Sequence, residues 1–198
     1  MKLFRSAVFI FAYVVILLVT YCVHARYFSV NVVFYSAILD ALLAAILLLP
    51  LLVVTRYFDV LGSLEKGQAF VICILTGYIF AISVPTVIDR SLSFYILEKL
   101  EQRGGGIRQD RFAEVFSREY MEEYRLVDVR LTEQAESGTI RIEDGCVKLT
   151  PRGQKLAAIS GYFRQNFLPK HRLLMGSYTD DLVDPFRRSG DGGDYRCH

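Results

Sequence analysis

Charged side chains are scarce in the first half of this chain of 198 residues, where residues 1–88 hold only 8 of the 44. The other 36 lie in residues 89–198. Because lipid disfavours charge and water favours it, this division predicts a membrane half followed by a water-soluble half. The chain is 53% hydrophobic and has four cysteines, so its composition excludes disordered, collagen-like and disulfide-rich secreted proteins.

Motifs for catalysis or metal binding are equally scarce. The three histidines, His24, His171 and His198, do not stand at metal-ligand spacing from cysteines or acids. The run 104–106 is all glycine, but it lacks the preceding strand and the Gly-Lys-Ser/Thr ending of a phosphate-binding loop. A net charge of +2 indicates no strong preference for nucleic acid. We therefore expect no catalytic residues, no cofactor, no metal and no small-molecule substrate.

Three apolar segments are each long enough to cross a bilayer, whose hydrocarbon core takes about 20 helical residues. They cover residues 6–23, 32–54 and 68–88. The first follows Lys2 and Arg5 and so resembles a signal peptide, but its length and the two later spans favour retention as an anchor. The sequence predicts a mostly α-helical membrane protein with three transmembrane helices.

Small residues recur at every fourth position in two of these spans. Ala37, Ala41 and Ala45 form one stripe, and Gly77 and Ala81 form another. Stripes of this kind allow helix backbones to approach closely. They predict either packing among the three spans or docking onto another membrane protein or a second copy of the chain.

Asp40 is the one ionisable residue near the middle of a predicted span. A charge at that depth is costly, so the carboxyl group needs a polar partner. Depth along the helices places the hydroxyl groups of Tyr13, Thr76 and Tyr78 at comparable levels. We expect a structural hydrogen bond or a subunit contact. The alternative is a small transporter or membrane-enzyme component that uses Asp40, which would normally need a second ionisable group nearby.

The second half has the element order of a small α+β domain. Hydrophobic periodicity predicts three helices, and alternation on both sides of Asp144-Gly145 predicts a hairpin. Thr150-Pro151 then provides a cap and a first-turn proline for a closing helix that ends before Pro169. The apolar residues expected on the inner face of this helix are Leu156, Ile159, Phe163 and Phe167. We assign residues 89–170 to this domain and residues 171–198 to a flexible tail.

Short sequence motifs in this half resemble those of the MarR/PadR-like winged-helix group. Tyr95-Ile96-Leu97-Glu98-Lys99-Leu100 resembles the opening helix of that group, and Arg130-Leu131 through Ser137-Gly138-Thr139-Ile140 resembles the end of its recognition helix. Leu149-Thr150-Pro151-Arg152-Gly153 resembles the Leu-Thr-x-x-Gly step that leaves the wing. The resemblance covers about residues 91–168 and implies a winged helix, a fold that serves both DNA binding and protein interaction.

The charge of the expected recognition helix departs from that family. Residues 121–136 hold five acids against Arg125 and Arg130, and an acidic helix is repelled by phosphates. We therefore expect a protein-interaction face there, and a membrane-tethered DNA-binding transcription regulator is the alternative. The residues of this candidate face are Glu122, Arg125, Asp128, Arg130 and Glu133.

The sequence thus predicts a membrane-anchored winged-helix protein that acts as a non-catalytic accessory or regulatory subunit of a larger membrane complex. Counts of flanking cations do not settle its orientation. Because winged helices normally work in the cytosol, we expect a bacterial inner-membrane protein whose C-terminal domain is cytoplasmic. Cys146 and Cys197 are then expected to be free thiols, and a disulfide between them would require an extracytoplasmic domain.

Overall fold

A computed structural model describes residues 2–187 and 197. The chain divides into two compact units, Met1–Arg125 and Leu126–His198. Helices account for 71% of the chain, and the small remainder of regular structure is sheet. The division falls inside the predicted domain of residues 89–170, between its second and third helices.

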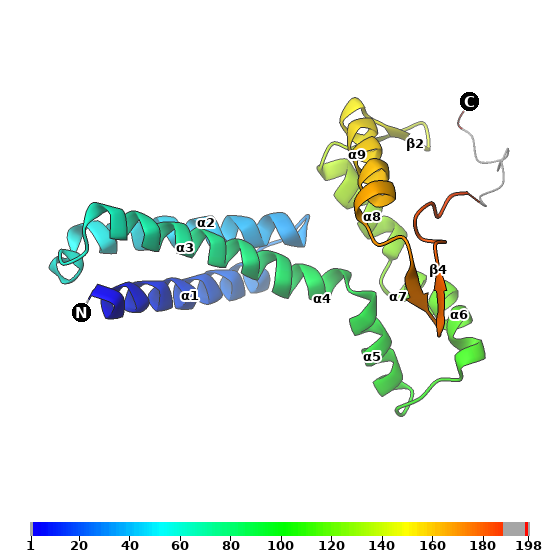
Figure 1. Cartoon of the computed structure of the whole chain (residues 1–198), viewed down its shortest axis with the longest axis horizontal. Coiled ribbons are helices and arrows are strands. Elements are labelled where there is room, and N and C mark those ends of the chain that lie inside the picture. The colour runs from blue at the N-terminus through cyan, green and yellow to red at the C-terminus, as the bar shows by residue number, and fades with distance from the viewer. Residues whose placement is uncertain (1, 188–196, 198) are drawn as a thin grey trace. The chain divides into compact units, whose positions relative to one another are not determined.

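Three long apolar helices form the first part of the N-terminal unit: α1 (Lys2–Tyr27), α2 (Val33–Val54) and α3 (Ser63–Ala81). All three contact one another (Figure 1). The segments Lys2–Tyr27, Val33–Leu51 and Ser63–Arg90 are each long and apolar enough to cross a membrane, as the sequence predicts for three helices. Their shared core contains Phe9, Tyr13, Leu17, Ala41, Ala44, Ala45, Leu48, Ala69 and Cys73.

The third span begins five residues earlier than predicted because its first turn is capped. The Glu65 carboxylate accepts a hydrogen bond from the Gly62 amide at 2.7 Å and pairs with Lys2 at 2.9 Å. These contacts satisfy the polar groups at the start of the helix. Hydropathy alone assigns the same residues to the connector that precedes the span. The helical path then continues through a π-helical segment at Ile82–Thr86 and α4 (Val87–Arg90).

Two further helical segments complete the N-terminal unit. The first is α5 (Leu92–Gln102). The second runs without a break through α6 (Phe112–Glu114), a π-helical turn at Val115–Tyr120 and α7 (Met121–Glu123). Arg125 has a φ of +44°, in the left-handed region, and this residue separates α7 from the next helix.

The C-terminal unit contains α8 (Leu126–Glu136), the hairpin β1 (Ile140–Glu143) and β2 (Cys146–Leu149), and α9 (Pro151–Phe167). The predicted hairpin turn is confirmed, because Asp144 and Gly145 have φ values of +52° and +75°. The start of α9 is confirmed as well, since the Thr150 hydroxyl accepts a hydrogen bond from the Gly153 amide at 3.1 Å.

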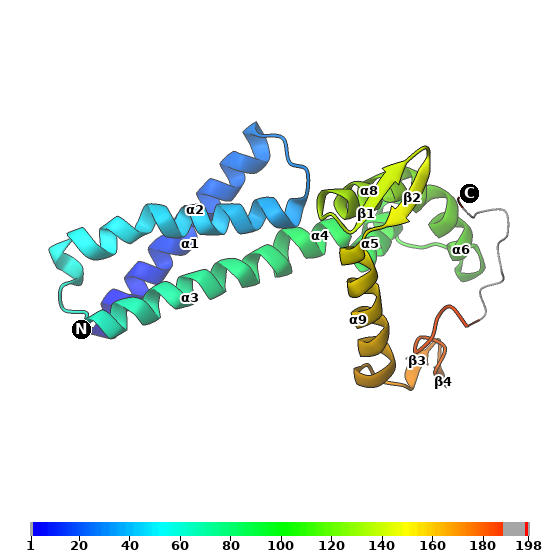
Figure 2. The ribbon, with the colours of Figure 1, turned by 90° about the horizontal axis from the view of Figure 1, so that it is seen from above.

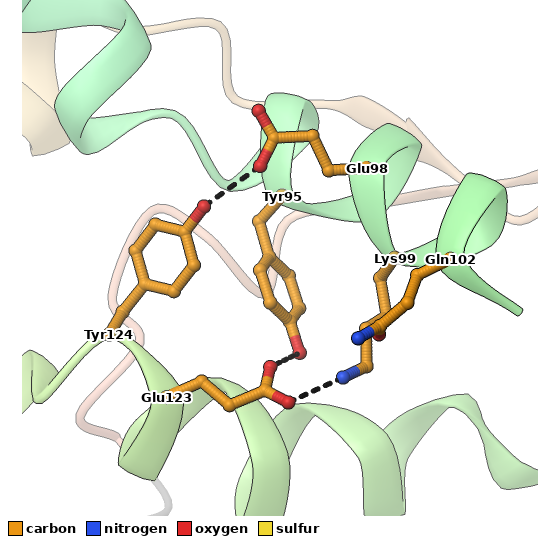
Figure 3. Close-up of a pocket in the computed structure, with 6 residues that line it drawn as sticks. All are labelled: Tyr95, Glu98, Lys99, Gln102, Glu123 and Tyr124. Atoms are coloured by element: carbon orange, nitrogen blue, oxygen red, sulfur yellow. Dashed lines mark hydrogen bonds and ion pairs between the residues drawn. The ribbon is translucent and has the colours of Figure 1, made fainter.

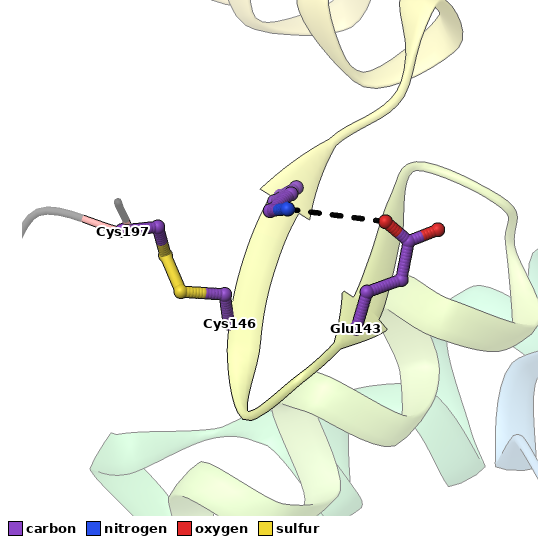
Figure 4. Close-up of a disulfide and its surroundings, with 4 residues drawn as sticks. Glu143, Cys146 and Cys197 are labelled. Carbon is purple, nitrogen blue, oxygen red and sulfur yellow. Dashed lines mark ion pairs between the residues drawn. A yellow bond between two sulfur atoms is a disulfide. The ribbon is translucent and has the colours of Figure 1, made fainter.

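Three expectations about this unit are wrong. The face of α9 predicted to point inward is exposed, because no described residue of its own unit covers it. A second hairpin, β3 (Arg172–Leu174) paired with β4 (Ser177–Thr179), forms where the sequence predicts a flexible tail (Figure 2). Cys146 and Cys197 form a disulfide instead of two free thiols, and it joins the end of the chain to β2 (Figure 4). The glycine-rich part of the predicted tail, 188–196, lies outside the described residues.

Candidate functional site

A pocket of about 270 Å³ lies between α5 and the end of α7. Figure 3 shows the side chains of the two segments pointing toward one another across it. We call it the tyrosine–glutamate pocket and define it by its lining residues: Tyr95, Glu98, Lys99, Gln102, Glu123 and Tyr124.

Helical geometry places the pocket residues of α5 on one face. Tyr95, Glu98, Lys99 and Gln102 follow the spacing i, i+3, i+4 and i+7, which puts side chains above one another on a helix. The helix begins at a cap in which the Phe94 amide donates a hydrogen bond to the Ser91 hydroxyl at 3.3 Å. The local sequence therefore fixes which side chains line this wall.

Lys99 holds the two walls together. Its side chain is 4% exposed, and its ammonium group lies 2.7 Å from a Glu119 carboxylate oxygen and 2.6 Å from one of Glu123. Arg103 also donates to both oxygens of Glu119 at 2.9 Å. The hydrogen bonds to Glu119 and Glu123 raise the pKa of Lys99, and those from Lys99 and Arg103 lower the pKa of Glu119.

Aromatic rings pack behind and beside these ion pairs. The ring centroids of Tyr95 and Tyr120 are 4.4 Å apart, and those of Tyr95 and Tyr124 are 5.3 Å apart in an edge-to-face arrangement. The Tyr95 hydroxyl donates to Glu123 at 3.2 Å, and the Tyr124 hydroxyl donates to Glu98 at 2.9 Å. That bond to Glu98 raises the pKa of Tyr124, because it stabilises the neutral phenol.

The pocket carries an excess of negative charge against aromatic walls. Lys99 is already engaged by two carboxylates, whereas Glu98 is held by Tyr124 and, among residues 2–187, lies within ion-pair distance of no cation. Carboxylates next to tyrosine faces attract cationic groups through charge and through the ring quadrupole. The arrangement therefore suits an ammonium or guanidinium group, which would meet Glu98 and the Tyr124 ring.

The ion pairs predict that the tyrosine–glutamate pocket loses stability at acid pH. The pKa of Glu119 lies below its ordinary value of 4.5, so the pairing contributes stability above that pH and loses it as the pH falls through the lowered value. We expect the near-ultraviolet circular dichroism of the tyrosines to weaken as the pH falls below 4.5. In Glu119→Gln the signal should be weaker at neutral pH and respond less to acid. Glu101→Gln, on the exposed side of α5, is the control. An unchanged acid response in Glu119→Gln would contradict the assignment.

The partner of Asp40 is not one of the three predicted hydroxyl groups. Asp40 is 1% exposed, and its Oδ1 lies 2.7 Å from Nδ1 of His24. The sequence analysis places His24 in a connector, but α1 extends to Tyr27 and so brings the imidazole to the carboxyl group. Tyr13 instead donates to the Ala41 carbonyl at 3.1 Å, and the side chains of Thr76 and Tyr78 are half-buried and exposed.

The small-residue stripes lie inside the bundle. Ala37 and Ala81 are fully buried, Ala41 and Ala45 are about 5% exposed, and Gly77 is buried against Ala41 and Tyr13. Of the two predicted roles, packing among the three spans accounts for these residues. Their burial leaves them no free surface for docking onto another protein.

The residues of the candidate interaction face are divided between the two units. Glu122 and Arg125 belong to the N-terminal unit, whereas Asp128, Arg130 and Glu133 belong to the C-terminal unit. Within α8, Arg130 pairs with Glu133 at 2.6 Å, and Glu133 is 9% exposed. A residue buried in such a pair is poorly placed to meet a partner.

The tyrosine–glutamate pocket is the site that the sequence analysis missed. The sequence does contain an indication of this pocket, because the polar residues Glu98, Lys99 and Gln102 stand at helical spacing from Tyr95. In the described part of the chain, no three His, Cys, Asp or Glu side chains gather closely enough to hold a metal ion. Comparison of the sequence and structure with protein-family models, curated proteins and solved structures finds no match.

Proposed function

We propose that this protein is a membrane-anchored, non-catalytic accessory or regulatory subunit of a larger membrane assembly. In this proposal a basic side chain of the partner docks in the tyrosine–glutamate pocket. The observation that carries it is the Glu98 carboxylate, held at the pocket wall by Tyr124 and left without a cation among residues 2–187.

The membrane helices support association with a partner. Three spans are too few to enclose a substrate path alone, and their small residues are already used in packing against one another. An anchor that holds a docking site near a membrane protein raises the local concentration of that site without any new contact.

A winged-helix arrangement remains part of this proposal. The helices, the β1–β2 wing and α9 follow one another in the predicted order. The charge of α8 opposes DNA binding, because Asp128, Glu133 and Glu136 outnumber Arg130, which pairs with Glu133. Protein contact is therefore the favoured use of this fold.

Charge reversal at Glu98 tests the docking proposal. We expect Glu98→Lys to shift the full chain, extracted in mild detergent, from a large assembly to its own size, because a cation would then face the basic side chain of the partner. The matched control is Glu101→Lys, which makes the same charge change one turn along α5, outside the pocket lining. Equal behaviour of the two variants on size-exclusion chromatography would contradict the proposal.

A second candidate function follows from the His24–Asp40 pair. Two titratable side chains in contact within apolar helices are what a proton-coupled transporter or membrane-enzyme component would use. The same size measurement separates the candidates. Under this one, Asp40→Asn leaves the assembly intact and removes an activity. Under the docking proposal the pair is structural, so the variant either weakens the assembly or has little effect.

The proposal also includes the side of the membrane on which the C-terminal unit lies. Disulfides persist in oxidising compartments and are rare in the cytosol. The Cys146–Cys197 disulfide therefore favours an extracytoplasmic C-terminal unit over the cytoplasmic location expected from the winged-helix resemblance. Lys2, Arg5, Arg56 and Lys66 would then lie on the cytoplasmic side, and the counts of flanking cations oppose neither orientation.

A further inference from the structure

One face of α9 is apolar and exposed. Leu156, Ile159, Phe163 and Phe167 recur at helical spacing, and their exposed fractions lie between 48% and 63%. Figure 2 shows α9 extending from the wing to the second hairpin. Helix α9 packs on the wing mainly at its first turn, where Gly153 is buried. Most of its apolar face is therefore left without a partner among residues 126–187 and 197.

The second hairpin, which follows α9 in the chain, also exposes apolar side chains. Leu173 is opposite Tyr178 in the β3–β4 register, and the two side chains are 58% and 74% exposed. The turn between the strands presents Met175, which is 85% exposed. We call the four apolar α9 residues together with Leu173, Met175 and Tyr178 the α9–hairpin surface.

The charged side chains of α9 and β3 have one sign, whereas Asp180 and Asp181 after β4 pair with Arg187. From Pro151 to Leu174 the sequence has no acid and five cations: Arg152, Lys155, Arg164, Lys170 and Arg172. At about 3.6 residues per turn, Lys155 and Arg164 fall on opposite borders of the apolar face of α9. An apolar face bordered by long cationic side chains is typical of helices that lie in a membrane interface, where the cations reach the headgroups.

We propose that the α9–hairpin surface binds the surface of a bilayer that contains anionic lipids. Charge favours an anionic bilayer over a second copy of the chain. Phosphate headgroups complement the five cations, whereas a second copy of the same surface would repel them. The three spans tether this unit to a bilayer, so it needs little intrinsic affinity to stay bound. This inference does not depend on docking at the tyrosine–glutamate pocket.

The absence of tryptophan from the chain gives a direct test. In Phe167→Trp the new residue is the sole tryptophan, and lipids with brominated acyl chains quench it only where it enters the bilayer. We expect the full-length variant, in nanodiscs that contain brominated phosphatidylglycerol, to lose most of its tryptophan fluorescence. Ile142→Trp is the control, because Ile142 is equally exposed on the wing of the same unit and outside this surface; it should keep its fluorescence.

Charge dependence completes the test. Neutralising Lys155 and Arg164 as Lys155→Gln and Arg164→Gln should weaken binding by about fivefold per charge, and zwitterionic nanodiscs should quench Phe167→Trp far less. Phe163→Trp serves as a second reporter if Phe167→Trp does not fold. Unquenched emission in both lipid mixtures would overturn the proposal. So would blue-shifted emission that resists quenching, since protein would then cover the face, or quenching unaffected by either charge change.

Discussion

Replacing Gly77 with leucine should prevent α1, α2 and α3 from packing together. A Cβ atom at this position would lie 2.7 Å from the Ala41 Cβ and would overlap the Tyr13 hydroxyl group. Tyr13 cannot move away without losing its hydrogen bond to the Ala41 carbonyl. Overpacking of a close interface costs about 1–3 kcal/mol, and a leucine brings three further carbon atoms. We expect a sharp fall in folded protein, measured by detergent-denaturant unfolding and by yield from membranes.

Gly67 is the matched control for this prediction. It lies on the same helix, α3, and a Cβ atom there would meet no other atom within 4 Å. Gly67→Leu should therefore unfold as the parent chain does. If Gly77→Leu and Gly67→Leu were equally stable, the close approach of the three helices would be wrong.

Replacing Gly153 with valine should separate α9 from the β1–β2 hairpin. A Cβ atom at Gly153 would overlap the backbone carbonyl oxygen of Thr139 and lie 3.1 Å from Leu149. The same junction is held by Thr150, whose amide donates to the Thr139 carbonyl at 3.1 Å and whose hydroxyl donates to the Gly138 carbonyl at 2.7 Å. Since backbone rather than a flexible side chain blocks the site, we expect at least the usual overpacking cost of about 1–3 kcal/mol.

Thermal unfolding followed by circular dichroism measures this effect. Gly161→Val is the control, because Gly161 lies on the same helix and nothing stands within 4 Å of its Cβ position. Both substitutions add the same β-branched residue, so propensity cancels in the comparison. A melting temperature that falls equally in the two variants would mean that α9 does not rest on Thr139.

Local chemistry explains which elements could be predicted from the sequence. The Asp144-Gly145 turn requires positive φ at two adjacent residues, and few residue pairs tolerate it. Gly138 ends α8 with a φ of +68°, and Thr150 caps α9. Each of these features depends on residues that are close together in the chain. The turn and the two helix ends can therefore be predicted without knowledge of tertiary contacts.

The His24–Asp40 contact could not be read in this way. It depends on where α1 ends and on the register between α1 and α2, and neither is encoded in hydropathy. The polar residues after Cys22 resemble a connector, yet the backbone hydrogen bond from Phe28 to the His24 carbonyl continues the helix. The length of α1 therefore determines that His24 is the partner of the buried Asp40 carboxyl group.

Periodicity also left open what each face meets. The spacing of Leu156, Ile159, Phe163 and Phe167 shows that these residues share a face, and the structure shows that the described part of their own unit does not cover it. In α5 the apolar periodicity does not mark Glu98, Lys99 and Gln102 as residues of a pocket. The pocket becomes visible only when α7 brings Glu123 and Tyr124 opposite them.

Photo-crosslinking from the pocket tests the docking proposal most directly. A photoreactive amino acid at Gln102, on the pocket wall, should form one discrete adduct with another membrane protein in intact membranes. The account predicts that Glu98→Lys abolishes this adduct and that Glu101→Lys leaves it unchanged. An adduct that survives Glu98→Lys, or crosslinks to lipid alone, would contradict the account.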